Sequence, residues 1–296
     1  MDEATVPAKP ESSANSKVPP TAWGVAYLRT FTDTPFTAEI FKILEDRRKA
    51  QGTPDFAEEM KRAPLAPQLE ARYKLVDRLV RAQSADQILE VASGLAPRGV
   101  NFALSDPHLR YVEVDLPEMA TQKRDILSHL DISLPGNLEV KDGDALSFDD
   151  LVKAVAGFTK DRSIVVVNEG LMRYLNFDQK ATLAQNVKRL LQEFYGAWVT
   201  PDISLRSSMG REDEVAGGHI RNLTNMTGVD ISQNVFESEE QAERWFEDLG
   251  FSVERHNFLE VTDELVSPAR LGMSPKQVQR LNGTCPAFVM RLKNQI

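Results

Sequence analysis

Cysteine is nearly missing from this sequence, because Cys285 is the single one among 296 residues. One cysteine cannot form an internal disulfide, and together with four histidines it makes a poor ligand set for a structural metal. No stretch approaches the ~18 consecutive apolar residues of a membrane span. The first twenty residues also lack the apolar segment of a signal peptide. The composition therefore predicts a soluble, cytoplasmic protein with no structural metal and no membrane partner.

Positive charge is also in deficit. Lysine and arginine number 35 against 44 aspartates and glutamates, so the formal net charge is −9. This balance argues against a nucleic-acid partner, which a broad basic face would have to hold. Residues 1–20 carry four prolines and three serines and are predicted to be a disordered tail. The ordinary apolar content elsewhere predicts a single domain over residues 21–296.

The hydrophobic pattern changes its period along the chain. Apolar residues recur at helical spacing in residues 21–85, which predicts a helical N-terminal extension. Strands are then predicted at Gln87–Ala92, Tyr111–Asp115, Leu138–Val140, Ser163–Asn168, Gly196–Thr200, Phe251–Glu254 and Pro286–Leu292. Helices between them are predicted at Pro117–Leu130, from a cap at Asp178 to Phe194, and from a Ser238–Gln241 capping box to Leu249. This alternation predicts an α/β fold with about seven mostly parallel strands flanked by helices.

Ligands of an open parallel sheet bind beyond the carboxyl ends of its strands, so the residues that follow each strand are the first candidates. Gly94 lies in a small-residue turn after the first strand and would let a ligand approach the backbone. Asp115 ends the second strand, 21 residues further on, which is the spacing of a carboxylate that binds ribose hydroxyls. A turn without a ligand and a helix cap are the respective alternatives.

Two further carboxylates follow later strands. Asp144 comes after the third strand and is placed to accept from an adenine amino group, or it belongs to an ordinary turn. Glu169 ends the apolar fourth strand, where an unpaired buried carboxylate would be costly. It therefore needs either a cationic ligand or an arginine.

These residues together resemble the leucine carboxyl methyltransferase family, a branch of the class I methyltransferases that use S-adenosylmethionine (SAM) and that include polyketide O-methyltransferases. The similar segments are Tyr111–Pro117 with Lys123–Arg124, Asn168–Leu175, Ala26–Arg29 and Ala71–Asp77. The family's Gly-x-Gly-x-Asp-Thr-Arg motif is altered here, where Ala92–Arg98 reads Ala-Ser-Gly-Leu-Ala-Pro-Arg. The resemblance implies the Rossmann-like class I methyltransferase fold.

The resemblance also implies roles for individual residues. Arg72 would contact the methionine carboxylate of SAM, and Arg29 would close the same side of the pocket. Gly94 would line the amino-acid moiety and Asp115 the ribose. Asp144 and Ala145 would lie at the adenine, and Glu169 would face the methionine ammonium. Tyr174 would shape the floor near the reacting methyl group.

The acceptor side is open in the sequence. Residues 86–204 are interpreted as the SAM-binding core, and residues 205–235, with four glycines, as a lid insertion. The rest of the chain, residues 236–296, is predicted to complete the sheet. Candidate acceptor contacts are Arg173, Met209, His219 and Arg221. Surface charges or local core packing are the alternatives for these four.

We predict a SAM-dependent O-methyltransferase that acts on a carboxylate or hydroxyl of a small-molecule acceptor. A SAM-binding protein without catalysis is one alternative. A nicotinamide-dependent oxidoreductase is another, disfavoured because the Gly-x-Gly-x-x-Gly turn is missing. The sequence leaves the acceptor and the oligomeric state open.

Overall fold

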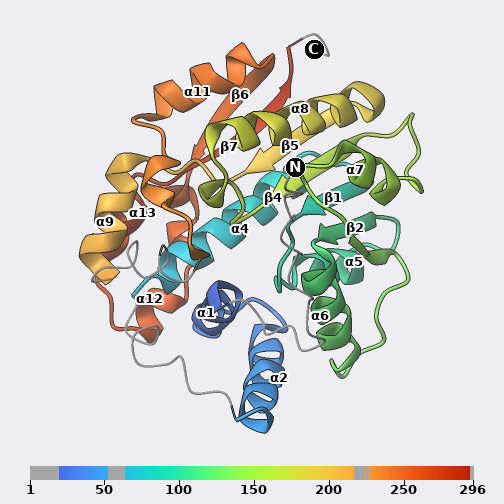
Figure 1. The fold of residues 1–296 in the computed structure, drawn as a ribbon. Helices are drawn as coiled ribbons and strands as arrows, with labels where there is room; N and C mark the ends of the chain where they lie inside the picture. Colours follow the sequence, from blue (N-terminus) through green and yellow to red (C-terminus); the bar gives the residue numbers. More distant parts are fainter. Residues whose placement is uncertain (1–19, 53–63, 217–223, 225–226, 294–296) are drawn as a thin grey trace, which may run out of the picture.

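The computed structural model describes residues 20–52, 64–216, 224 and 227–293 (Figure 1). A seven-stranded sheet runs through the molecule in the order β3-β2-β1-β4-β5-β7-β6. Its strands are β1 Gln87–Val91, β2 Arg110–Asp115, β3 Leu138–Asp142, β4 Ile164–Asn168, β5 Gly196–Thr200, β6 Phe251–Asn257 and β7 Pro286–Leu292. The first five are parallel, and β7 is antiparallel to both of its neighbours. The predicted class I methyltransferase fold is confirmed.

Helices cover both faces of this sheet. They are α1 Pro20–Arg29, α2 Thr37–Ala50, α4 Ala66–Ala82, α5 Arg98–Ser105, α6 Pro117–Ser128, α7 Phe148–Ala154, α8 Phe177–Phe194, α9 Arg206–Ala216, α11 Glu239–Asp248, α12 Ser267–Arg270 and α13 Pro275–Asn282. Short 3-10 turns are η1 Met172–Tyr174, η2 Ile231–Gln233 and η3 Phe258–Glu264. None of the helices in the described part of the chain is both long and apolar enough to cross a membrane.

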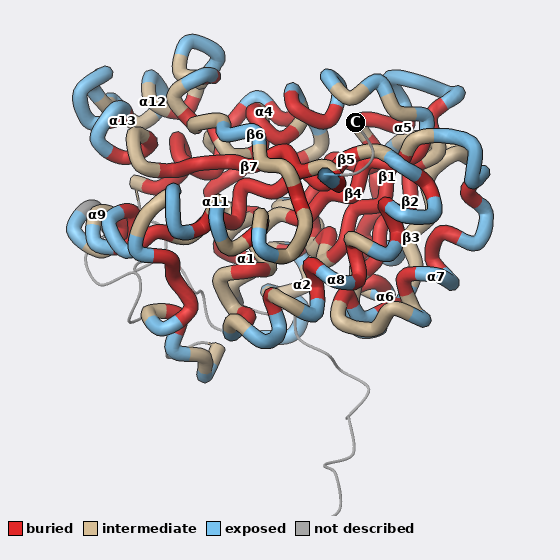
Figure 2. The backbone as a smooth tube through the Cα atoms, turned by 90° about the horizontal axis from the view of Figure 1, so that it is seen from above, coloured by how far each residue is buried: buried red, intermediate tan, exposed pale blue. Residues whose placement is uncertain are grey.

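The core lies on the two faces of the sheet, and alternate residues of a strand enter different layers. Val166 of β4 packs in the layer of α7, α8 and α11, whereas Val165 and Val167 pack in the layer of α4, α5 and η3. In Figure 2 the central strands β1, β4 and β5 are therefore buried along nearly their whole length between partly exposed helices, whereas the edge strands β3 and β6 are only partly buried. Burial on both faces explains why the apolar run of β4 is so easily recognised in the sequence.

The edges of the elements differ from the sequence prediction in places. Strand β3 extends to Asp142, which pairs with Asp115, and β6 extends to Asn257, which pairs with Pro286. Both strands continue through polar residues that backbone pairing tolerates. The predicted cap at Asp178 is wrong, because Asn176 caps α8 in a reciprocal capping box with Gln179. Two side-chain to backbone bonds at Asn176 outweigh the charge of Asp178 in the first turn.

The capping box predicted at Ser238 is only half formed. Ser238 Oγ accepts from the Gln241 amide at 3.2 Å, but Gln241 Oε1 accepts from the amide of Glu237 instead of Ser238. The segment predicted as a lid contains the eleven-residue helix α9 and the turn η2. The lid itself stays a prediction, since residues 217–223 and 225–226 lie outside the described residues.

Candidate functional site

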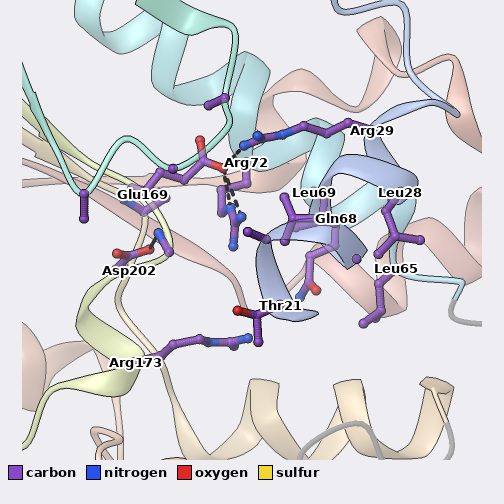
Figure 3. A pocket seen from close by; sticks show the side chains of 18 of the residues that line it. Thr21, Leu28, Arg29, Leu65, Gln68, Leu69, Arg72, Glu169, Arg173 and Asp202 are labelled. Carbon is purple, nitrogen blue, oxygen red and sulfur yellow. Dashed lines mark hydrogen bonds and ion pairs between the residues drawn. The ribbon is translucent and has the colours of Figure 1, made fainter. Parts of the chain in front are cut away.

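A cavity lies at the carboxyl edge of the sheet, where the strand order reverses between β1 and β4. Its walls come from the loops after β1, β4 and β5, from α1, and from the N-terminal half of α4 (Figure 3). Six of the predicted residues line it: Arg29, Arg72, Gly94, Glu169, Arg173 and Tyr174. The fold thus brings together side chains that are far apart in the sequence.

The turn after β1 is shaped for close approach to its backbone. Ala92 and Gly94 both have positive φ angles, 53° and 51°. The Gly94 amide donates to Asp115 Oδ2 at 2.7 Å, and the Leu116 amide donates to Oδ1 at 2.8 Å. Burial raises the pKa of Asp115, although these two amides oppose the rise. Asp115 is not the helix cap of α6, because Leu116 occupies the cap position without a side-chain bond.

Three arginines surround the carboxylate of Glu169. Arg29 Nη2 lies 2.9 Å and Arg72 Nη2 3.0 Å from Oε1, and Arg98 Nη2 donates to Oε2. Burial alone would raise the pKa of Glu169, but the Arg72, Arg98 and Arg29 guanidinium groups hold it well below its usual range. Arginines therefore satisfy the buried charge that the sequence leaves open, and the contact with a methionine ammonium stays a prediction.

Arg98 forms the floor of this charge cluster, and its side chain is 0% exposed. Besides Glu169 it binds Asp77 at 2.6 Å and Glu90 at 2.5 Å. Burial raises the pKa of Asp77 to about 6, against the opposing charge of Arg98. Arg98 and Glu90 are absent from the residues that the sequence predicts for the site. Two features of the sequence could have identified them: Glu90 is a charged residue inside an apolar strand, and Arg98 closes the glycine turn.

Unused N–H groups remain on two of the arginines. Arg29 Nε is buried and has no hydrogen-bond partner within the described ranges. Arg72 binds Glu169 through Nε and Nη2, which leaves its Nη1 without a partner among those same residues. Both side chains line the cavity. Planar guanidinium groups with free donors are suited to a carboxylate ligand.

Asp202, which follows β5, sets the course of the loop after β4. It accepts from the amides of Gly170 at 2.7 Å and Leu171 at 2.8 Å, and from Asn168 Nδ2 at 2.8 Å. These bonds fix the backbone on both sides of Glu169. The sequence analysis does not single out Asp202, although its position after a central strand meets the criterion applied to the other carboxylates.

The remaining predicted residues lie elsewhere. Asp144 is exposed and its Oδ1 accepts from the Leu146 amide at 2.8 Å, in the manner of an ordinary turn. Ala145 is buried in the core, and neither it, Asp144 nor Asp115 lines the cavity. Met209 packs with Ile231 and Val235, with Tyr174 packed against them. His219 and Arg221 lie outside the described residues.

Tyr174 lines the cavity from η1, beside Arg173. Burial raises the pKa of its phenol, so the hydroxyl stays protonated at neutral pH. No hydrogen bond joins Tyr174 Oη to another described residue. Among the described residues, no group of three or more His, Cys, Asp or Glu side chains is arranged to hold a metal ion.

A model of the leucine carboxyl methyltransferase family matches residues 26–188, more than half of the chain. The chain belongs to this family. Membership makes it a methyltransferase whose methyl donor is SAM. The match includes Arg29, Arg72, Gly94, Asp115 and Glu169.

Two solved structures share the fold. A DUF574 family protein from Streptomyces avermitilis is 14% identical, with a TM-score of 0.60 over 92% of this chain and 97% of its own. A structure described as a methyltransferase from Thermobifida fusca is 17% identical, with a TM-score of 0.58 over 94% of this chain and 96% of its own. No curated protein matches the chain. At these identities the likeness concerns the fold alone.

Proposed function

We propose that this family member is an O-methyltransferase that transfers the methyl group of SAM to a carboxylate or hydroxyl of a small molecule. The observation that carries the proposal is the pair Arg29 and Arg72. Both guanidinium groups line a cavity at the strand-order reversal, both bind Glu169, and both keep unused donors. A site of this charge and shape suits the amino-acid end of SAM.

The residues present fit the rest of that molecule as well. Arg72 and Arg29 would bind the carboxylate of its methionine part, and Glu169 retains lone pairs for the ammonium. Asp115, held against the turn by the Gly94 amide, can still accept from ribose hydroxyls. Asp144 and Ala145 follow the neighbouring strand β3 and would lie on the adenine side, outside the part of the cavity that the arginines line. Bound SAM would supply an electrophilic methyl group on a sulfonium.

The contribution of the chain to the reaction is alignment and exclusion of water. The apolar side chains of Leu28, Leu65 and Leu69 form one wall of the cavity, and Tyr174 lines it from η1. They would hold the acceptor in a water-poor space. A carboxylate acceptor needs no general base for this reaction, whereas a hydroxyl does.

The start of α5 argues against a nicotinamide dinucleotide. A pyrophosphate needs free amides at the first turn of the helix after β1. Here the cap residue is Pro97, which has no N–H, and the Gly99 amide donates to Glu113 Oε1 at 3.3 Å. The Glu113 carboxylate thus occupies the position at the helix start that the pyrophosphate of the dinucleotide would need.

Isothermal titration calorimetry with SAM, S-adenosylhomocysteine and NAD tests the binding half of the proposal. We expect both sulfur ligands to bind and NAD not to bind, and binding of NAD alone would overturn the proposal. Methyl transfer from labelled SAM to a panel of carboxylic acids and phenols then tests turnover. SAM binding without transfer to any of them would favour a binding protein without catalysis.

A further inference from the structure

A second polar cluster, formed by Arg173, Gln68 and Glu212, lies in the same cavity. Figure 3 shows Arg173 and Gln68 apart from the arginines that bind Glu169. Arg173 of η1 donates from Nη2 to both carboxylate oxygens of Glu212 on α9, at 3.1 and 3.3 Å. Gln68 of α4 donates from Nε2 to Glu212 Oε1 at 3.2 Å and approaches Cys285 Sγ at 3.1 Å. Side chains of two elements distant in the sequence, η1 and α4, therefore bind one carboxylate of a third, α9.

The ion pair leaves most of the Arg173 guanidinium unused. Within the described part of the chain, Nε and Nη1 of Arg173 have no hydrogen-bond partner, and the side chain is 18% exposed. The charge of Glu212 raises the pKa of Arg173, against the effect of burial, so the group remains a cation. A cation held by one end, with free donors in a cavity, suits an anion.

Part of the cavity wall is apolar. Leu28, Leu65 and Leu69 line the cavity together with Phe258. A ligand that satisfied Arg173 would therefore bury an apolar body beside its charged group. Among the described residues that line the cavity, Arg173 is the one arginine that the proposed SAM site does not use, and beside the apolar part of the wall it suits a small carboxylic acid rather than a sugar or a polyanion.

We propose that Arg173 binds a carboxylate of the methyl acceptor, which makes small carboxylic acids with an apolar body the substrate class. The inference rests on the proposed function, because it takes the rest of the cavity to be the SAM site. Glu212 fixes one end of the guanidinium, and the acceptor carboxylate takes the free N–H groups.

The test uses the full chain saturated with S-adenosylhomocysteine and two matched probes, 4-hydroxybenzoate and 4-hydroxybenzamide, whose affinities are measured by calorimetry. We expect the carboxylate to bind at least about tenfold more tightly than the neutral amide, as one charge-assisted contact implies. Arg173→Gln should abolish this preference, and Arg173→Lys should keep part of it. The matched control is Arg211→Gln, a nearby arginine that donates to Thr284 Oγ1 and does not line the cavity.

Arg173→Gln leaves the buried Glu212 without a cation and with only the bond from Gln68 among the described residues, so the double variant Arg173→Gln/Glu212→Gln is measured as well. It should fold normally and also lack the preference. We expect these variants to bind S-adenosylhomocysteine with an affinity within about twofold of wild type, so that the loss of carboxylate preference is measured separately from cofactor binding. If the wild-type chain does not bind S-adenosylhomocysteine, the proposed function fails. If the wild-type chain binds S-adenosylhomocysteine but does not prefer the carboxylate probe, or binds neither probe, only the Arg173 inference is overturned. The same holds if the Arg173 variants keep the preference.

Discussion

Replacement of Arg98 by methionine is the sharpest test of how the cavity floor is held. The guanidinium is 0% exposed and binds three carboxylates. Without it, Glu169 keeps Arg29 and Arg72, and Asp77 is 21% exposed and reaches water. Glu90, at 1% exposure, keeps only the bond from Tyr111 Oη at 2.8 Å. The uncompensated charge is therefore chiefly that of Glu90.

Removal of one partner from a buried ion pair costs about 3–5 kcal/mol. We expect Arg98→Met to lower the free energy of unfolding by about that amount, which is a large share of the ~5–15 kcal/mol typical of a domain. The double variant Arg98→Met/Glu90→Gln removes the stranded charge and should recover about half of the loss. Urea denaturation followed by circular dichroism measures all three proteins.

A surface pair makes this reasoning refutable. The surface pair of Arg162 and Asp86, each 57% exposed, provides the control, and Arg162→Met should change stability by less than about 0.5 kcal/mol. A loss below about 1 kcal/mol in Arg98→Met, or a loss no larger than that of Arg162→Met, would show that Arg98 does not hold the cluster.

Three other predictions concern the cofactor, the metal dependence and the pH dependence. Arg72→Ala and Glu169→Ala should each weaken SAM binding by ~2–4 kcal/mol, because Arg72→Ala removes donors for the ligand carboxylate and Glu169→Ala removes both the acceptor for its ammonium and the partner of Arg29 and Arg72; calorimetry with Arg162→Ala as control checks this, and wild-type affinity in both would mean that the pocket is misplaced. Methyl transfer should survive EDTA, because the displacement needs no Lewis acid; loss of turnover on chelation, restored by Mg²⁺, would contradict this. Burial raises the pKa of Glu113 from 4.5 to about 7, although Lys123 opposes the rise. Between pH 4.5 and pH 7 the folded chain therefore keeps a proton on Glu113 that the unfolded chain has released. The free energy of unfolding should fall as the pH rises through this range. Glu113→Gln/Lys123→Met should flatten that dependence in urea titrations, and an unchanged slope would assign it to other groups.

The sequence by itself determined the sheet and the position of the site along it. Strand β4 is a β-branched run buried on both faces, and such a run has few alternatives to a central parallel strand. The positions of Gly94 and Asp115 at the ends of two predicted parallel strands placed both at the same edge of the sheet, and there the Gly94 amide donates to the Asp115 carboxylate. The first pattern lies within one strand and the second depends on the pairing of two strands, so neither requires contacts between distant parts of the chain.

Tertiary structure alone decided which charges meet in the cavity. Arg29, Arg72 and Arg98 come from three different helices, and only the packing of α1, α4 and α5 on the sheet directs them to Glu169. The contact of Arg173 with Glu212 depends in the same way on the position of α9, a helix that the sequence pattern does not predict. An isolated arginine in a sequence carries no sign of its partner, because a long side chain reaches many positions. Its partner is selected when the chain folds and the guanidinium group loses water, because a buried charge is stable only beside an opposite charge.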